Sequence, residues 1–231
     1  MTDDPLQTLR DAREAARRGA HAEALEKYLW FHHHALEHSP SLTGVRLSYA
    51  ISEWVELGNA YPPAMDALES IQNNNLRLLK EGSCERRRFH DFASINRYLS
   101  RSELTTTMFA ELAEHQPEFA RACFRSALPA LIRTRSFALA RRFVTSPNEQ
   151  LDTHLSQFAT VLNTRRRTIH DDVLIGVFAT HLRQLLSIFE ELDENEEANV
   201  LQGKAIEALT DPLDQEEVRR QLLCARSMIS R

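Results

Sequence analysis

The chain has 231 residues, 42% hydrophobic and 26% charged, which is typical of a soluble globular protein able to bury a large core. Its formal net charge of −5 provides no overall attraction for nucleic acid, and its three cysteines (Cys84, Cys123 and Cys224) lack the spacing of a disulfide framework or metal motif. The acidic N-terminus lacks the apolar run of a secretory signal, and the run Val173 to Ala179 is too short to span a bilayer, so we expect a cytoplasmic protein.

The N-terminal segment predicts a helical hairpin. Asp4 can cap the first helix, and Gln7 completes a capping-box pattern. Gly19 follows the periodic part of this helix, and glycine tolerates the left-handed conformation that ends a helix. A second helix then runs to Pro40, because the residue before a proline avoids helical geometry. We therefore expect the first hairpin over residues 5–39.

The second helix of this hairpin has one broad apolar side, formed by Ala24, Leu25, Tyr28, Leu29 and Phe31. The small side chain of Ala24 allows a neighbouring helix to approach closely. The pattern resembles the tetratricopeptide repeat, and the matching positions are Gly19, Glu23, Ala24, Leu25, Tyr28, Ala35, Leu36, Glu37 and Pro40. The segment between Tyr28 and Ala35 is longer than in that family by about one helical turn. The resemblance implies antiparallel helix pairs stacked in a right-handed superhelix with a concave binding groove.

Further hairpins are expected along the chain. The second covers residues 44–80, and its first helix carries an apolar stripe from Leu47 to Trp54. The third covers residues 86–117, with Ser102 as the cap of its second helix. Two residues of the third hairpin depart from the family pattern, since Asn96 replaces an aromatic residue and Thr105 replaces a small alanine.

The C-terminal half continues in the same way. Ser146 to Glu149 form a capping box that opens a helix containing Leu151, and the longest periodic stretch covers about residues 168–192. A last helix at about 214–230 can cover the open end of a solenoid. We predict an all-α fold of about twelve helices, as a single tetratricopeptide-like domain over residues 1–231 with this C-terminal capping helix.

Histidines cluster in the first hairpin. His32, His33, His34 and His38 share one helix, and His34 and His38 are one turn apart, which is a spacing that can hold a metal. Consecutive helical residues point about 100° apart, so the triplet cannot act together. We expect a structural or surface role for these side chains, with no metal site and no cofactor. A metal-dependent enzyme built on them is the third of three functional hypotheses.

Arginines form short runs at residues 86–88 and 165–167 and the pair Arg141–Arg142. Such patches suit a phosphate ligand or nucleic acid, which gives the second hypothesis. The alternative is that they are solvated helix ends, since no aromatic residues alternate with them. An acidic cluster over residues 190–197 surrounds a helix-to-helix turn, where carboxylates complement a helix dipole.

The first hypothesis is a non-enzymatic scaffold that binds a protein or peptide. No cysteine, serine, histidine or aspartate stands in a known catalytic signature, and there is no phosphate-binding glycine loop. In the family that the chain resembles, the first helix of each pair lines the groove. Carried over to this chain, that rule gives Ser48, Ser52 and Glu56 in the second pair and nine candidate partner-binding residues elsewhere: Arg13, Arg17, His90, Ser94, Arg97, Tyr98, Arg125, Arg133 and Arg183. Most of the nine are basic, so we expect a locally basic groove that takes an acidic segment or a C-terminal carboxylate.

Overall fold

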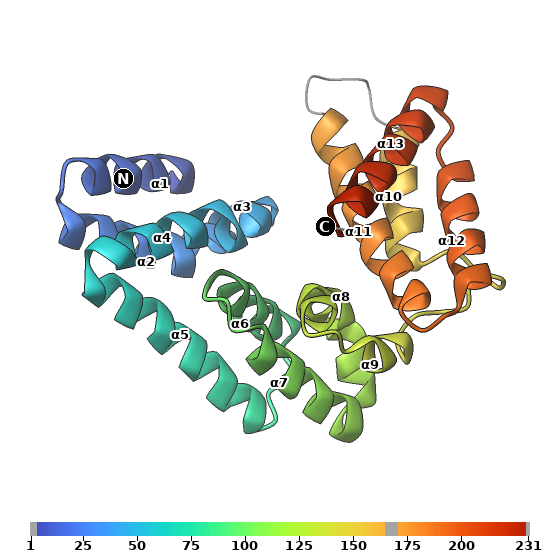
Figure 1. Ribbon diagram of the computed structural model, residues 1–231. Coiled ribbons are helices and arrows are strands. Elements are labelled where there is room, and N and C mark those ends of the chain that lie inside the picture. Colours follow the sequence, from blue (N-terminus) through green and yellow to red (C-terminus); the bar gives the residue numbers. More distant parts are fainter. Residues whose placement is uncertain (1–3, 165–170, 230–231) are drawn as a thin grey trace. The chain divides into compact units, whose positions relative to one another are not determined.

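The computed structural model describes residues 4–164 and 171–229, with only the backbone described at 171 and 224–229. All regular elements in these ranges are helices, which confirms the all-α prediction (Figure 1). The chain divides into two compact units, Met1–Ala130 and Leu131–Arg231. The single domain expected from the sequence stays a prediction.

The first unit is a series of helical hairpins (Figure 1). Helix α1 packs on α2, α4 on α5, and α6 on α7, while α2–α4 and α5–α6 contacts join successive hairpins. The elements are α1 (Pro5–Arg17), α2 (His21–His38), the 3-10 turn η1 (Pro40–Leu42), α3 (Thr43–Leu47), α4 (Tyr49–Ala60), α5 (Pro62–Lys80), α6 (Arg86–Tyr98), α7 (Ser102–His115) and most of α8 (Pro117–Arg133).

The second unit is built around α11, which packs against α9, α10, α12 and α13. Its elements are α9 (Phe137–Arg141), α10 (Thr153–Thr164), α11 (Asp171–Glu190), α12 (Asn195–Glu207) and α13 (Pro212–Ile229). By length and composition α11 could cross a membrane from Asp172 to Glu190, but half of that stretch is buried inside the protein. Leu182, Leu185, Leu186 and Phe189 are all fully buried, as in the core helix of a globular unit.

The first hairpin follows the sequence prediction closely. The backbone N–H of Leu6 donates to an Asp4 carboxylate oxygen at 3.0 Å, and Gly19 has a φ of +79°, in the left-handed region. Ala24 is fully buried, which confirms its predicted place in the core. The capping box is wrong in one detail, because the Gln7 side chain bonds Asp11 and Arg10 instead of returning to the cap.

The second hairpin differs from the prediction at its start. The stripe from Leu47 to Trp54 predicts one helix, but the structure breaks it at Ser48 into α3 and α4. The Ser48 hydroxyl donates to the carbonyl of Gly44 at 2.6 Å. A serine that bonds the carbonyl four residues earlier offers the backbone an alternative to regular helix, which accounts for the break.

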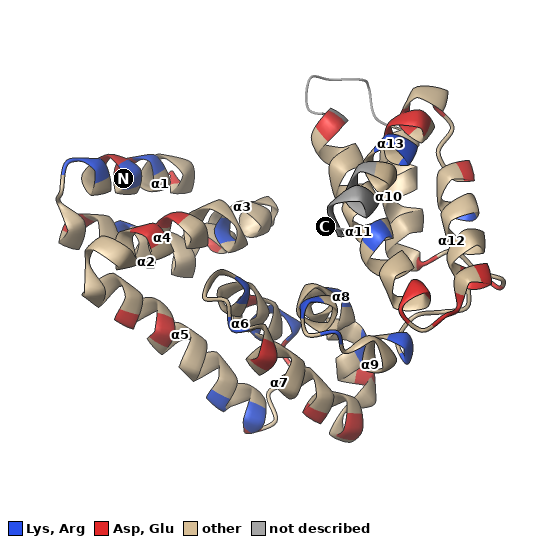
Figure 2. Cartoon of the chain, viewed as in Figure 1, with Lys and Arg blue, Asp and Glu red and all other residues tan. Residues whose placement is uncertain are grey.

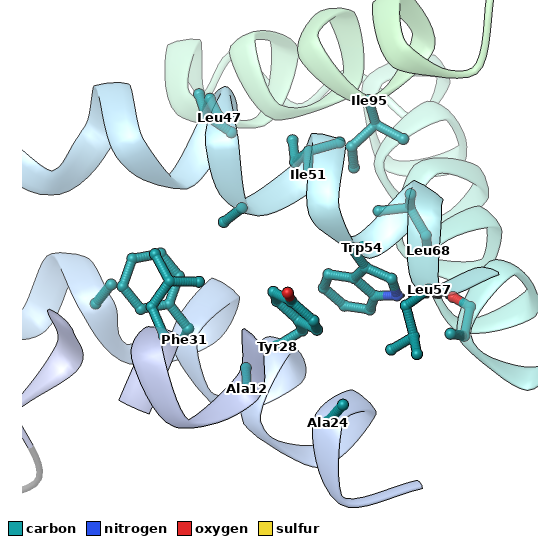
Figure 3. Close-up of a cluster of buried hydrophobic side chains, with 14 of the residues drawn as sticks. Ala12, Ala24, Tyr28, Phe31, Leu47, Ile51, Trp54, Leu57, Leu68 and Ile95 are labelled. Atoms are coloured by element: carbon teal, nitrogen blue, oxygen red, sulfur yellow. Dashed lines mark hydrogen bonds between the residues drawn. The ribbon is translucent and has the colours of Figure 1, made fainter. Parts of the chain in front are cut away.

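Aromatic side chains join the first two hairpins in one hydrophobic cluster (Figure 3). Tyr28 of α2 stacks on Trp54 of α4 with 6.1 Å between ring centroids. The Trp54 indole N–H donates to the Ala64 carbonyl at 2.7 Å and so ties α4 to α5. Phe31 and Ile51 complete the buried seam between the hairpins, and both are fully buried. The cluster places α1, α2 and α4 side by side.

A buried ion pair connects three hairpins. Arg46 of α3 is 1% exposed, and its guanidinium donates both to a carboxylate oxygen of Asp91 on α6 and, at 3.3 Å, to the backbone carbonyl of His32 on α2. Burial lowers the pKa of the His32 imidazole to about 3, and the Arg46 charge adds to this effect. His32 is therefore neutral at physiological pH, and Asp91 is the counter-charge of Arg46.

The two departures from the repeat pattern in the third hairpin contact each other. The Asn96 side-chain amide donates to the Thr105 hydroxyl at 3.1 Å, and both residues are fully buried. Each side chain thus supplies a partner for a polar group that burial would otherwise leave unsatisfied. The predicted cap at Ser102 is wrong, because this residue is the first of α7 and the cap is Arg101, with no side-chain bond.

The predicted capping box at Ser146 to Glu149 is also wrong. This segment is a turn, and α10 begins at Thr153 with Asp152 as its cap. A single Asp152 oxygen accepts from the backbone N–H groups of His154 and Leu155 at 2.9 and 3.1 Å, and it lies 3.2 Å from the His181 ring. Burial acts to raise the Asp152 pKa, but these hydrogen bonds lower it overall. The aspartate is therefore ionised where it caps α10.

Replacing Ala24 with phenylalanine is expected to destabilise the protein by ~1–3 kcal/mol. The site has no free space, since Ala24 is fully buried in the cluster that joins α1, α2 and α4. Chemical denaturation of the variant measures the change. Ala22, which is exposed on the same helix, gives the matched control, and equal stability of Ala24→Phe and Ala22→Phe would contradict the packing described here.

Replacing Asp91 with alanine is expected to destabilise the protein by ~3–5 kcal/mol, because it leaves the buried Arg46 charge without its partner. Removing both charges in the double variant Arg46→Met with Asp91→Leu should cost less than the single change. Urea unfolding of the three proteins measures both values. If Asp91→Ala were as stable as the native protein, the buried Arg46 charge would not need Asp91 as its partner.

Candidate functional site

Two pockets on the first unit collect residues from the first helices of the hairpins. We call the pocket between α1, α2 and α4 the N-terminal pocket, and the pocket between α6 and α8 the basic pocket. Each contains part of the predicted groove. The N-terminal pocket includes Arg13, Arg17 and Glu56, and the basic pocket includes His90.

The basic pocket has a cavity volume of about 250 Å³ and is lined by Arg86, Arg87, His90, Ala122 and Ser126. Three of the five lining residues are basic and none is acidic. Arg86 and Arg87 are exposed, and neither makes an ion pair with a residue that the structure describes. Their positive charge is therefore available to a ligand.

The third arginine of the run has a different environment. Arg88 donates to the Glu85 carboxylate at 2.8 Å, to the Ser83 hydroxyl at 3.1 Å and to the Asn75 amide oxygen at 3.4 Å. These bonds tie the start of α6 to the end of α5. Arg88 is a structural residue, and only Arg86 and Arg87 contribute free charge to the pocket.

The pKa of the His90 imidazole depends on the charges around the basic pocket. Burial lowers its pKa, the neighbouring Asp91 carboxylate opposes this, and Arg46, Arg125 and Arg97 lower the pKa further. Arg97 and Arg125 thus act on the same side chain, although they come from α6 and α8. A bound anion would offset these positive charges and favour the protonated imidazole.

The other predicted groove residues of the first unit vary in accessibility. Arg97 is exposed, lies over the ring of Tyr98 at 5.0 Å and donates to the Leu47 carbonyl at 3.4 Å. Tyr98 is half-buried against the hydrophobic cluster, and Ser94 is buried at 7% exposure. Arg125 is exposed on α8. Arg97 and Arg125 therefore remain accessible beside the pocket, whereas Ser94 faces the interior.

The N-terminal pocket contains opposite charges. The Arg13 Nε–H lies 2.8 and 2.9 Å from the two carboxylate oxygens of Glu53, so this predicted groove arginine is already paired. The hydrogen bond to Glu53 raises the Arg13 pKa, and burial opposes it. Arg17 is exposed one turn later on α1, and Glu56 is exposed one turn later on α4.

Three arginines of the second unit pair with residues of the predicted acidic cluster. Arg183 pairs with Glu190, Arg135 with Glu191 at 2.6 Å, and Arg141 with Glu194 at 2.8 Å. Arg141 also lies over the Phe189 ring at 4.9 Å. Three of the acidic residues are thus held by ion pairs. Among the predicted groove residues of this unit Arg183 is paired, while Arg133 is exposed at the end of α8.

Figure 2 shows that basic residues recur on α6 and α8, while acidic residues lie on α4, on the first part of α5, whose last turn is basic, and around the turn before α12. The predicted run at residues 165–167 lies outside the described residues. Arg86 and Arg87 were missed as groove residues because they stand at the start of α6. Their spacing from His90, three and four residues away, is the sequence signal that places the three on one helix face.

The remaining candidates have structural surroundings. The rings of His34 and His38 both lie beside Trp30, at 5.4 and 5.7 Å, and His34 contacts Glu37 at 3.1 Å. No group of three potential metal ligands occurs among the residues that the structure describes. Cys123 is buried, and burial raises the pKa of its thiol to about 12. It therefore stays a neutral core side chain.

Comparison with known protein families, curated proteins and solved structures finds no match to this chain. The resemblance to the tetratricopeptide repeat therefore rests on the residues and helix order of the chain itself. Function has to be argued from the chemistry of the pockets.

Binding of inorganic phosphate in the basic pocket is expected to raise the pKa of His90 and to tighten as the pH falls. The free imidazole has a lowered pKa, so a bound anion favours proton uptake there. An NMR titration of the histidine ring signals between about pH 8 and pH 5 measures the shift. His115, exposed at the end of α7, is the internal control, and an unchanged His90 pKa at saturating phosphate would contradict an anion in this pocket.

Proposed function

We propose that the protein is a non-enzymatic scaffold that binds an acidic segment, or a C-terminal carboxylate, of a partner protein at the basic pocket. The observation that carries this proposal is the composition of the pocket, where Arg86, Arg87 and His90 meet without an acidic lining residue. Free arginines in a hollow are available for a carboxylate, because the planar guanidinium can donate two parallel hydrogen bonds to it.

The binding mode we propose relies on several weak contacts. An exposed arginine–carboxylate pair contributes only ~0.2–1 kcal/mol, so one contact cannot hold a partner. Arg86 and Arg87 in the pocket, with Arg97 and Arg125 beside it, together provide a basic surface of useful size. Such binding is screened by salt, so affinity should fall as ionic strength rises.

We further propose that the hairpins stack as a tetratricopeptide-like, right-handed solenoid, with the groove along α1, α4, α6 and α8. Support comes from the order of helix contacts in the first unit and from the buried small residue Ala24. Pockets between α1 and α4 and between α6 and α8 also agree with a binding face on the first helices. A cytoplasmic location remains part of the same proposal.

A phosphate-bearing ligand is the second candidate, because phosphate uses the same hydrogen bonds as carboxylate. The pocket with Arg86 and Arg87 favours it, while the net charge of −5 argues against extended nucleic acid. Arg141 does not support binding of a phosphate-bearing ligand, because its guanidinium already pairs with Glu194. No observation on the described residues favours the metal-dependent enzyme.

Neutralising the basic pocket is expected to weaken binding of a glutamate-rich probe peptide by about tenfold or more, because at least two charge-assisted contacts are lost. The variants are Arg86→Gln with Arg87→Gln, and Arg97→Glu with Arg125→Glu. Fluorescence anisotropy at low salt measures the affinity, with one peptide bearing a free C-terminus and another an amidated one. Circular dichroism checks that helix content and melting temperature are retained.

The matched control for Arg86→Gln with Arg87→Gln is Arg77→Gln with Lys80→Gln on α5, which removes the same two positive charges from the same unit. Arg77 pairs with Glu81 at 2.6 Å on the surface, and Lys80 is exposed. The proposal predicts full affinity in the control and loss in the pocket variants. Equal loss in both would show attraction to net charge alone, and tighter binding of a phosphorylated peptide than of the acidic one would favour the second candidate.

A further inference from the structure

The N-terminal pocket is chemically different from the basic pocket. It has a cavity volume of about 440 Å³, within the range of about 300–1,000 Å³ that small-ligand pockets occupy. Its lining combines two arginines and a histidine with two glutamates, one tyrosine and three apolar residues: Arg13, Arg17, His21, Glu53, Glu56, Tyr28, Ala16, Leu57 and Ala60.

One opposite-charge pair closes the inner part of the pocket. Arg13 is hydrogen-bonded to both oxygens of Glu53, and the Tyr28 hydroxyl donates to Glu53 Oε2 at 3.4 Å. Burial raises the pKa of Tyr28, with the Glu53 charge adding to the rise, so the phenol keeps its proton. These three groups satisfy one another and form a fixed wall.

Two further residues of opposite charge, Arg17 and Glu56, line the pocket one helical turn further along. Arg17 follows Arg13 by four residues on α1, and Glu56 follows Glu53 by three residues on α4, so each lies on the same helix face as its predecessor. Both are exposed, and neither makes an ion pair with any residue in the described ranges. Arg17 uses only its Nε, which donates to the Arg13 carbonyl at 3.4 Å, so both terminal amino groups of the guanidinium can donate to a ligand.

The pocket also has apolar lining residues. Leu57 is 4% exposed and belongs to the same hydrophobic cluster as the Tyr28 ring (Figure 3). Ala16 and Ala60 add two small side chains to the lining. An apolar ligand group placed against these residues would lose water without burying a polar atom.

We propose that the N-terminal pocket binds a free α-amino acid with an apolar side chain. Its carboxylate accepts hydrogen bonds from Arg17, its ammonium group donates to Glu56, and its side chain packs on Leu57 and Ala16. The ligand thus completes the ion pairing that the protein leaves open. This site is separate from the basic pocket and would add recognition of a small metabolite to a scaffold.

The test compares leucine with two analogues that each lack one charge, N-acetyl-leucine and leucinamide. Isothermal titration calorimetry and amide NMR shifts of the isotope-labelled full chain measure binding. The proposal predicts saturable binding of leucine, about tenfold or more weaker binding of both analogues, and shifts in α1 and α4. No saturation by leucine at about 10 mM, or equal binding of leucine and N-acetyl-leucine, would overturn it.

Two variants test which protein residue binds the carboxylate of the ligand and which binds its ammonium group. Arg17→Met should weaken the binding of leucine more than the binding of leucinamide, which lacks the carboxylate. Glu56→Gln should weaken the binding of leucine more than the binding of N-acetyl-leucine, which lacks the ammonium group. The matched controls are Arg10→Met and Glu14→Gln, two exposed residues of α1 outside the pocket lining, which should bind leucine as the native protein does. Native affinity in both pocket variants would overturn the proposal, and so would equal weakening by the controls.

Discussion

The arrangement of the first unit depends on one buried charge. Arg46 is 1% exposed, and its guanidinium contacts the Asp91 carboxylate of α6 and the His32 carbonyl of α2. A charge taken out of water is tolerated only when a partner of opposite sign and further hydrogen bonds surround it. Helices α2, α3 and α6, which belong to three successive hairpins, must therefore meet at this point. The neutral state of His32 follows from the same constraint, because a second positive charge beside Arg46 would be costly.

Hydrophobic side chains pack between the helices that this ion pair brings together. Trp54 packs on Tyr28 of the preceding hairpin and bonds the carbonyl of Ala64, so a single side chain links α2, α4 and α5. Asn96 and Thr105 show that a buried polar pair can replace the aromatic and small residues expected of the repeat. The Asn96 side-chain N–H is satisfied by Thr105, whereas its buried side-chain oxygen has no hydrogen-bond partner among the described residues.

The surface chemistry follows from which arginines find partners inside the chain. Arg13, Arg135, Arg141 and Arg183 are held by glutamates, and they stabilise the contacts of their own units. Arg17, Arg86 and Arg87 make no ion pair with a described residue, and they line the two pockets of the first unit. This difference separates arginines that hold the fold from arginines that can recognise a ligand. It also explains how a chain with a net charge of −5 presents a basic hollow.

Local features of the sequence were enough to predict an all-helical fold and several of the helix ends. The stop at Gly19, the cap at Asp4 and the burial of Ala24 are local properties of the chain, because each depends on backbone conformation or side-chain size within one hairpin. The caps assigned to Ser102 and Ser146 were wrong because α7 already begins at Ser102, and because the segment after Ser146 is a turn that precedes α10 by several residues.

The candidate sites arise only from the packing of the hairpins. Arg13 and Glu53 are 40 residues apart in the chain, and Arg46 and Asp91 are 45 apart, so no local pattern identifies them as partners. Only the packing of successive hairpins determines which charges meet. For the same reason the sequence named Arg13 and Arg183 as binding residues alongside Arg17, although the fold neutralises the first two and leaves Arg17 exposed. Whether a charge is available to a ligand depends on its neighbours in space, because a paired guanidinium has already exchanged water for a carboxylate.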